Sequence, residues 1–260
     1  MATESYHAGV LDRDAAHVHP LKLALGMANA AEAAGARIYE MSEVSTTESG
    51  AKARVITAHG EVVADHVIFA CNGYLGDLAP SVAARVMPIN NYILATAPLA
   101  PELARSLISN RAAVADSKFV INYYRLSADN QLLFGGRESY GYLFPKNIKS
   151  FVQKAMLEIY PQLAGTPIDY GWGGTLAITM NRLPHLTRVA PNMLSASGYS
   201  GHGVAMATFC GALAADAVLG QAERFDAMAS IPTTRFPGGA SLRSPLLALA
   251  MAWYALRDRL

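Results

Sequence analysis

The chain has 260 residues, 52% of them hydrophobic and 16% charged, with a formal net charge of +1. This composition is typical of a globular protein with a sizeable core and excludes a disordered chain, and the near-zero charge does not indicate nucleic acid or an anionic membrane as a partner. Its two cysteines exclude a disulfide framework, and its histidines lack the spacing of a zinc site. The start of the chain lacks a signal-peptide pattern, and the apolar run 246–256 is shorter than the ~20 residues of a membrane span. We therefore expect a cytoplasmic protein without a membrane span or a metal.

The first 86 residues predict a helix followed by a small β-meander. Residues 21–36 have apolar positions at helical spacing, with Gly35 as a stop. A strand is expected at 37–40, a polar turn at 48–51, an alternating strand at 53–58 and a turn at Gly60. The apolar run 62–70 predicts one buried strand that ends at Cys71, Asn72 and Gly73.

The pattern of apolar and polar residues changes between about residues 87 and 174, where alternating runs predict an antiparallel sheet. Turns are expected at 129–130 and at 135–136, and one helix at 146–160, ended by Pro161. From residue 192 the chain returns to a strand, a glycine turn and an alanine-rich helix, and residues 241–260 predict a last helix. We therefore expect a discontinuous first domain (1–86 and 175–225), an inserted sheet domain (87–174) and a C-terminal extension (226–260).

The turn from Gly198 to Gly203 has the spacing G-x-x-G-x-G, the reverse of the dinucleotide fingerprint. Unpaired N–H groups at the start of the following helix favour an electron-rich oxygen, and glycines let a ring or phosphate come close. The same spacing fits a plain strand–helix turn, and the residues alone favour that interpretation. Neither G-x-G-x-x-G nor a phosphate loop occurs, so a complete dinucleotide-binding domain is not encoded.

Other candidate residues carry weaker signals. His202 lies inside the glycine turn and His185 follows Pro184, and a structural role is at least as much expected for each as a catalytic one. Ser200 lacks the spacing of a serine nucleophile. The predicted strands carry Tyr123, Tyr124, Arg125, Arg137 and Trp172, which could line a substrate pocket but are also ordinary strand residues.

Four ordered segments together are more specific: 19–44, 67–78 (VIFACNGYLGDL), 171–188 (GWGGTLAITMNRLPHLTR) and 198–220 (GYSGHGVAMATFCGALAADAVLG). They resemble the glycine oxidase/D-amino-acid oxidase superfamily of FAD-dependent oxidoreductases, and most of all its γ-glutamylputrescine oxidase-like branch. The resemblance implies an α/β (α+β) fold. It would comprise part of an FAD-binding domain of the glutathione-reductase-like type and an inserted antiparallel-sheet substrate domain.

The resemblance also implies roles for individual residues. The glycine turn would lie at the flavin ring, with backbone N–H groups of Gly201, His202, Gly203 and Val204 stabilising the reduced form. Val44 would contact the adenine, and Ala70, Asn72 and Gly73 would close over the adenosine and pyrophosphate. The substrate side of the pocket is expected to include Tyr124, Arg125, Trp172 and His185. Because Trp172 stands where sarcosine oxidase-like relatives carry the cysteine that attaches the flavin, we expect non-covalent FAD.

The reaction implied is oxidation of an amine C–N bond by hydride transfer to the flavin, followed by hydrolysis of the imine, with no dedicated catalytic base required. Ala205 stands where those relatives carry a lysine for the substrate carboxylate. A γ-glutamylated or simple polyamine is therefore expected. Two alternatives stay open: a non-catalytic remnant or binding subunit of a flavoprotein complex, and a subunit of a flavin-dependent amine dehydrogenase.

Members of the resembled family begin with a strand–GxGxxG–helix unit and about 150 further residues before the segment at 19–44. We therefore expect this chain to be a C-terminal portion, with exposed sheet edges and apolar faces. It would self-associate or bind a partner that supplies the missing half. Whether it acts as an enzyme by itself stays open.

Overall fold

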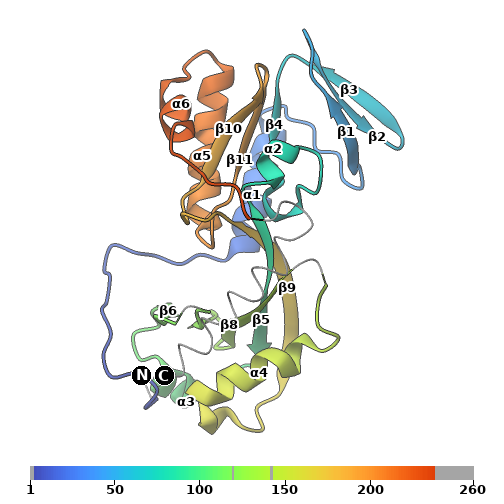
Figure 1. Ribbon diagram of the computed structural model, residues 1–260. Coiled ribbons are helices and arrows are strands. Elements are labelled where there is room, and N and C mark those ends of the chain that lie inside the picture. Colours follow the sequence, from blue (N-terminus) through green and yellow to red (C-terminus); the bar gives the residue numbers. More distant parts are fainter. Residues whose placement is uncertain (1–2, 119, 141–142, 238–260) are drawn as a thin grey trace. The chain divides into compact units, whose positions relative to one another are not determined.

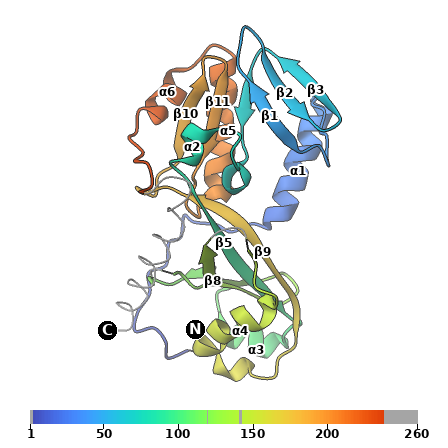
Figure 2. The same cartoon turned by 45° about the vertical axis from the view of Figure 1, so that its right-hand side comes forward.

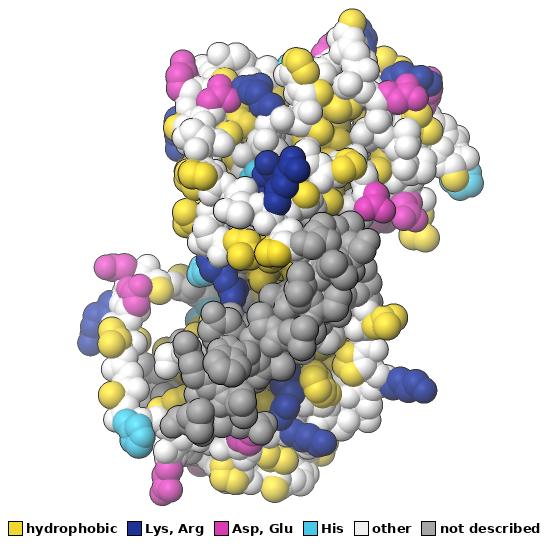
Figure 3. All heavy atoms as spheres, in the orientation of Figure 1, with side chains coloured by type: hydrophobic (Ala, Val, Ile, Leu, Met, Phe, Trp, Pro, Cys, Tyr) yellow, Lys and Arg dark blue, Asp and Glu magenta, His cyan; other side chains and the backbone are white. Residues whose placement is uncertain are grey.

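The computed structural model describes residues 3–118, 120–140 and 143–237, which form two units (Figure 1). Unit 1 contains residues 3–17 and 89–175, and unit 2 contains residues 18–88 and 176–237. Both units are thus discontinuous in sequence. Side chains of both charge signs are scattered over the face drawn in Figure 3, in keeping with the small net charge.

Unit 2 begins with helix α1 (Pro20–Ala33), which confirms the helix predicted at 21–36. Pro20 occupies the first helical turn, and His19 Nδ1 accepts a hydrogen bond from the Lys22 N–H at 3.4 Å. Gly35 has φ +96°, so the chain leaves the helix at a residue that tolerates this backbone. No residue of α1 is buried.

A three-stranded antiparallel sheet follows, in the order β1 (Val44–Glu48), β2 (Ala53–Thr57), β3 (Gly60–Ala64). It confirms the predicted meander but corrects two details. Residues 37–40 form no strand; a turn at 40–41, where Met41 has φ +53°, interrupts the extended chain. The run 62–70 is two strands, exposed β3 and then β4 (Val67–Phe69), because β4 pairs in a different sheet.

The second sheet of unit 2 has the order β10 (His185–Ala190), β11 (Met193–Ser197), β4 (Figure 2). β10 and β11 form an antiparallel hairpin, whereas β11 runs parallel to β4 with Met193 opposite Val67 and Ser195 opposite Phe69. The predicted sequence of strand, turn and helix after residue 192 is confirmed by β11 and α5 (Gly203–Val218).

Helices pack on both faces of this sheet. Leu186 and Leu194 face α5 and α6 (Glu223–Ala229), where they join a cluster with Leu213 and Phe225. The alternate positions, Phe69 and Met193, belong to a second cluster with α2 (Pro80–Ala83) and the 3-10 turn η1 (Asn72–Tyr74) region. The sequence analysis did not predict α2 or α6.

Unit 1 is built on a five-stranded sheet in the order β6 (Val114–Ala115), β7 (Tyr123–Leu126), β8 (Leu132–Tyr140), β5 (Met87–Thr96), β9 (Ile168–Ile178). The β6–β7, β7–β8 and β8–β5 pairs are antiparallel, as predicted. The core lies between this sheet and helices α3 (Pro101–Leu107) and α4 (Ile148–Ile159), around Tyr92, Phe134 and Tyr160.

Helix α4 confirms the helix predicted at 146–160: Asn147 Oδ1 accepts a hydrogen bond from the Ser150 N–H at 3.1 Å, and Pro161 begins the turn η2 (Pro161–Leu163). The turn at 129–130 is also confirmed, with φ +61° at Asn130. The turn expected at Gly135 and Gly136 is wrong, because β8 runs through both residues. A Cβ at Gly135 would collide with the ring of Tyr123, and one at Gly136 would lie 2.6 Å from Asn122 Oδ1. The predicted helix at 241–260 lies outside the described residues.

No helix in the described part of the chain is both long and apolar enough to cross a membrane.

Candidate functional site

The parallel pairing of β4 and β11 places the carboxyl ends of both strands at the same edge of the sheet. Ligands of open α/β sheets bind at this edge. The segment 70–73 follows β4, and the glycine turn 198–203 follows β11. The two segments are joined directly, because the Gly198 N–H donates a hydrogen bond of 3.1 Å to Asn72 Oδ1. The structure therefore brings together seven of the eight residues that the sequence analysis assigned to a cofactor: Ala70, Asn72, Gly73, Gly201, His202, Gly203 and Val204.

The backbone of the glycine turn is held in an unusual conformation. Gly198, Ser200 and Gly201 have φ values of +71°, +52° and +97°. The Ser200 N–H donates to the Ala177 carbonyl at 3.0 Å, and Ser200 Oγ accepts from the Thr179 N–H at 3.2 Å. These bonds fix the turn against the chain at 177–179, so its conformation is specified by the fold of unit 2.

The start of α5 presents free hydrogen-bond donors at this edge. The first helical hydrogen bond is from the Met206 N–H to the His202 carbonyl, and the His202 side chain makes no capping bond. Within the described residues, no acceptor is bonded to the N–H groups of Gly201, Gly203 and Val204. The prediction is wrong for the N–H of His202, which donates to the Tyr199 carbonyl at 2.9 Å as the turn closes. Gly201 and Val204 are exposed, and a Cβ at Gly201 would meet no atom within 4 Å. The edge thus offers a positive helix end to an electron-rich oxygen, with open space beside Gly201.

Val44 is placed differently from the other predicted cofactor residues. It begins β1 and is half-buried, in the sheet of β1, β2 and β3 rather than the sheet that carries the glycine turn. Its contact with an adenine stays a prediction.

Two predicted substrate residues of unit 1 share one face of the five-stranded sheet. A Cβ at Gly171 would meet Lys149 of α4, and one at Gly173 would meet Tyr92 and Phe144, so Trp172 between them points to the opposite face. Trp172 is 44% exposed there. Arg125 is half-buried, its Nη1 lies 3.5 Å from His17 Nδ1, and burial lowers the pKa of its guanidinium. Because β8 and β5 separate β7 from β9, Arg125 and Trp172 lie on strands about 14 Å apart.

Tyr124 belongs to the core instead. It is 2% exposed, stacks on Phe134 with ring centroids 5.3 Å apart, and contacts Tyr160 edge to face. Its neighbour Tyr123 shares the face of Arg125 and donates a hydrogen bond to Asn91 Oδ1. Tyr123 was a pocket candidate beside Tyr124 in the sequence, and the period of two in a strand places residues 123 and 125 on one face.

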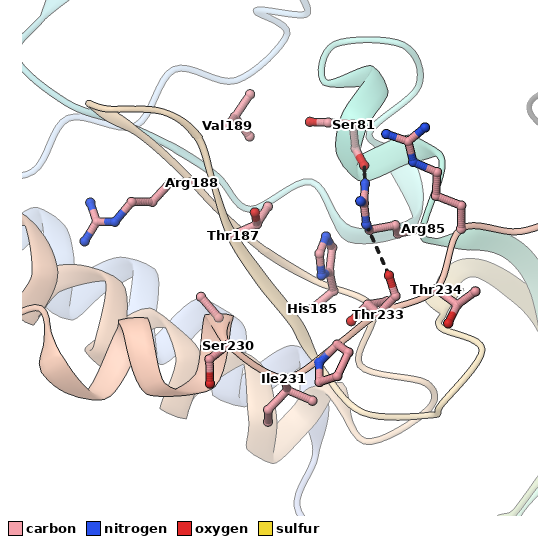
Figure 4. Close-up of a pocket in the computed structure, with 13 residues that line it drawn as sticks. Ser81, Arg85, His185, Thr187, Arg188, Val189, Ser230, Ile231, Thr233 and Thr234 are labelled. Carbon is pink, nitrogen blue, oxygen red and sulfur yellow. Dashed lines mark hydrogen bonds between the residues drawn. The ribbon is translucent and has the colours of Figure 1, made fainter.

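His185, the fourth predicted substrate residue, lies in unit 2 at the start of β10, opposite Ser197. It is 7% exposed, and burial together with the charge of Arg85 lowers its pKa to about 4. The imidazole is therefore neutral at pH 7. It lines a pocket of about 540 Å³ within unit 2 (Figure 4).

In the described residues no group of three or more His, Cys, Asp or Glu side chains is placed to hold a metal ion.

Comparisons with known proteins show the family and the fold of the chain. The family model "FAD dependent oxidoreductase" (DAO) matches residues 1–217. The γ-glutamylputrescine oxidoreductase of Escherichia coli (strain K12) is 43% identical over 261 residues, which cover 100% of this chain and 61% of that protein. The chain thus spans about three fifths of the length of this relative.

Solved structures show the same fold. The glycine oxidase from Geobacillus kaustophilus matches with a TM-score of 0.65 and 22% identity, over 76% of this chain and 54% of that one. The L-proline dehydrogenase from P. horikoshii matches with a TM-score of 0.63 and 21% identity, over 76% and 55% of the two chains. With the family model matching most of its length, this chain belongs to the DAO family of FAD-dependent oxidoreductases.

Proposed function

We propose that this chain forms the flavin-facing and substrate-facing parts of an FAD-dependent enzyme that oxidises the C–N bond of a γ-glutamylated or similar polyamine. One observation carries the proposal: the exposed glycine turn with unpaired N–H groups at the carboxyl ends of β4 and β11. The name of the E. coli relative supports the substrate class.

The residues at this edge fit the cofactor of the family. The N–H groups of Gly201, Gly203 and Val204 would face the electron-rich side of the flavin ring, where negative charge increases on reduction. Asn72 would keep the turn in place through its bond to Gly198, and the segment 70–73 would lie along the adenosine and pyrophosphate. Val44 is proposed to contact the adenine. When bound, FAD supplies the two-electron acceptor for the amine.

The chain's own residues would orient the amine. Arg125 and Trp172 lie on one face of the unit 1 sheet and would contact opposite ends of an extended substrate, since their strands are about 14 Å apart. Arg125 would pair with the γ-glutamyl carboxylate, while Trp172 would shield the apolar polyamine chain from water. Tyr124 would support this face from the core. His185 lies in unit 2, in a pocket of its own, and no role in holding the amine is proposed for it. If Ala205 lies beside the reacting carbon, as the resemblance implies, it would leave no cation there to hold a carboxylate.

The test uses the full chain alone and mixed with a polypeptide comprising the remaining part of the E. coli relative. FAD binding is measured by quenching of flavin fluorescence, and reaction by anaerobic bleaching of the flavin with γ-glutamylputrescine, putrescine or glycine. We expect non-covalent FAD binding in the mixture and fastest bleaching with γ-glutamylputrescine. Peroxide formation compared with dye reduction identifies the electron acceptor. A folded chain that gives no FAD binding in either preparation would contradict the proposal.

A further inference from the structure

The pocket in unit 2 lies outside the glycine turn and is formed by three segments that are distant in sequence (Figure 4). They are residues 81–85 at and after α2, residues 185–189 of β10, and residues 229–235 at the end of α6 and beyond. Arg85, Arg188 and Arg235 line it, and none of its lining residues is acidic. Its lining is therefore cationic.

Two buried polar atoms in this pocket have no hydrogen-bond partner among the described residues: His185 Nε2 and Thr233 Oγ1. His185 is 7% exposed, so more than nine tenths of it is buried. An unsatisfied buried polar group is costly, and a fold that keeps two of them in one pocket indicates a missing partner. An acceptor would satisfy both atoms if neutral His185 carries its proton on Nε2 and the Thr233 hydroxyl turns towards it.

The three arginines differ in how they are held. Arg85 is fixed by hydrogen bonds from Nη1 to the Ser81 carbonyl (2.7 Å) and from Nε to the Thr233 carbonyl (3.2 Å). Figure 4 shows Arg85 and Thr233 beside His185, with Arg188 pointing away from them. Arg188 pairs with Asp226 at 2.9 Å. Arg235 is exposed and has no carboxylate partner in the described part of the chain, so its charge is uncompensated.

We propose that this pocket binds a small oxyanion, the carboxylate or phosphate group of a small molecule, between Arg85 and Arg235, with hydrogen bonds donated by His185 Nε2 and Thr233 Oγ1. Burial and the charge of Arg85 lower the pKa of His185 to about 4, so the empty pocket holds a neutral donor at pH 7. A bound anion favours the imidazolium and raises this pKa. The pocket shares no lining residue with the glycine turn or the segment 70–73, and its ligand goes beyond the proposed function.

The test measures binding to the full chain without FAD by isothermal titration calorimetry at pH 7. Inorganic phosphate and succinate are the two probes, and chloride at matched ionic strength is the blank. We expect one or both probes to bind and to raise the pKa of His185 in an NMR titration of the imidazole. Which probe binds distinguishes a phosphate ligand from a carboxylate ligand.

Two variants and one matched control make the test specific. Arg235→Gln and Thr233→Val should each weaken binding about tenfold, since each removes a group that contacts the anion. Thr233→Val keeps the side-chain shape and should leave urea unfolding unchanged or more stable. Arg105→Gln makes the same charge change at an exposed site of unit 1 and should alter binding less than about twofold. The proposal is overturned if neither probe binds, or if Arg105→Gln weakens binding as much as Arg235→Gln.

Discussion

Gly201 has the most demanding backbone of the glycine turn, with φ +97°. A side chain there is strained whatever the space around it, so Gly201→Ala should lower the free energy of unfolding by about 1–2 kcal/mol and misdirect the free N–H groups that follow. Gly211→Ala is the matched control, because Gly211 lies inside α5 with no atom within 4 Å of its Cβ position. It should raise stability by about 0.5–1 kcal/mol. Urea unfolding measures the free energy of unfolding of both variants. Equal changes in the two variants would mean that the turn imposes no strain.

His185 links the stability of unit 2 to pH. Its pKa is lowered from 6.5 to about 4 in the folded chain, by burial and by Arg85. The unfolded state binds the proton more readily, so the contribution to stability is complete above pH 6.5 and is lost as the pH falls towards 4. The loss should be on the order of 3 kcal/mol. Urea unfolding between pH 4.5 and 7.5 measures it, and His185→Gln should flatten that dependence. An unchanged pH profile in the variant would show that other groups cause it.

The sequence predicted correctly those helices whose first and last turns carry a proline, an asparagine or a glycine. Pro20 and Gly35 mark the ends of α1, and Asn147 and Pro161 mark those of α4. The failures have tertiary causes. Gly135 looks like a turn residue in the sequence, but it lies inside β8 because the ring of Tyr123 occupies the place of a side chain.

The apolar run 62–70 forms two strands because its second half pairs with a strand that is distant in sequence, which no local pattern can indicate. Asn192 Nδ2 donates to the Asp65 carbonyl at 3.1 Å, and the Val67 N–H donates to the Asn192 carbonyl at 3.0 Å. These bonds, across more than 120 residues, turn β4 into a partner of β11. Only the three-dimensional fold could reveal this division.

The candidate site also was predictable only where local sequence patterns mark its residues. The glycine turn is visible in the sequence through its spacing, whereas Asn72 was assigned through the family segment that contains it. Alternation separated Tyr123 from Tyr124 but could not say which of them faces the core. The pocket around His185 was invisible, since Arg85, His185 and Thr233 come together only in the folded chain.

Helix α1 carries exposed apolar side chains, and none of its residues is buried. Leu21 and Leu25, one turn apart on the same face, are 61% and 55% exposed. Leu23 and Met27 lie on the opposite face, where Met27 Sδ is 3.9 Å from Thr208 Oγ1. Clustered exposed apolar side chains indicate an interaction surface. We propose that the chain self-associates through α1, and Leu21→Glu combined with Leu25→Glu should lower the association constant measured by sedimentation velocity. Leu219→Glu, at a single 79% exposed leucine, is the control. Equal effects of both changes would exclude α1 as the contact.

The described cores each lie within one unit. The cluster around Tyr92, Phe134 and Tyr160 belongs to unit 1, whereas those around Phe69 and Leu186 belong to unit 2. Cores that share no buried side chain can unfold at different denaturant concentrations, which breaks two-state behaviour. We therefore expect two transitions in urea.

Tryptophan fluorescence can separate these transitions. Trp172 lies in unit 1, and Trp253→Phe removes the only other tryptophan, so fluorescence then reports unit 1 while far-ultraviolet circular dichroism reports the whole chain. Adding Leu213→Ala, which leaves a cavity in the core of unit 2, should move one circular dichroism transition to lower urea and leave the fluorescence midpoint unchanged. If the fluorescence midpoint moves equally, the two cores unfold as one cooperative body, because loss of a buried group in unit 2 is then felt at Trp172.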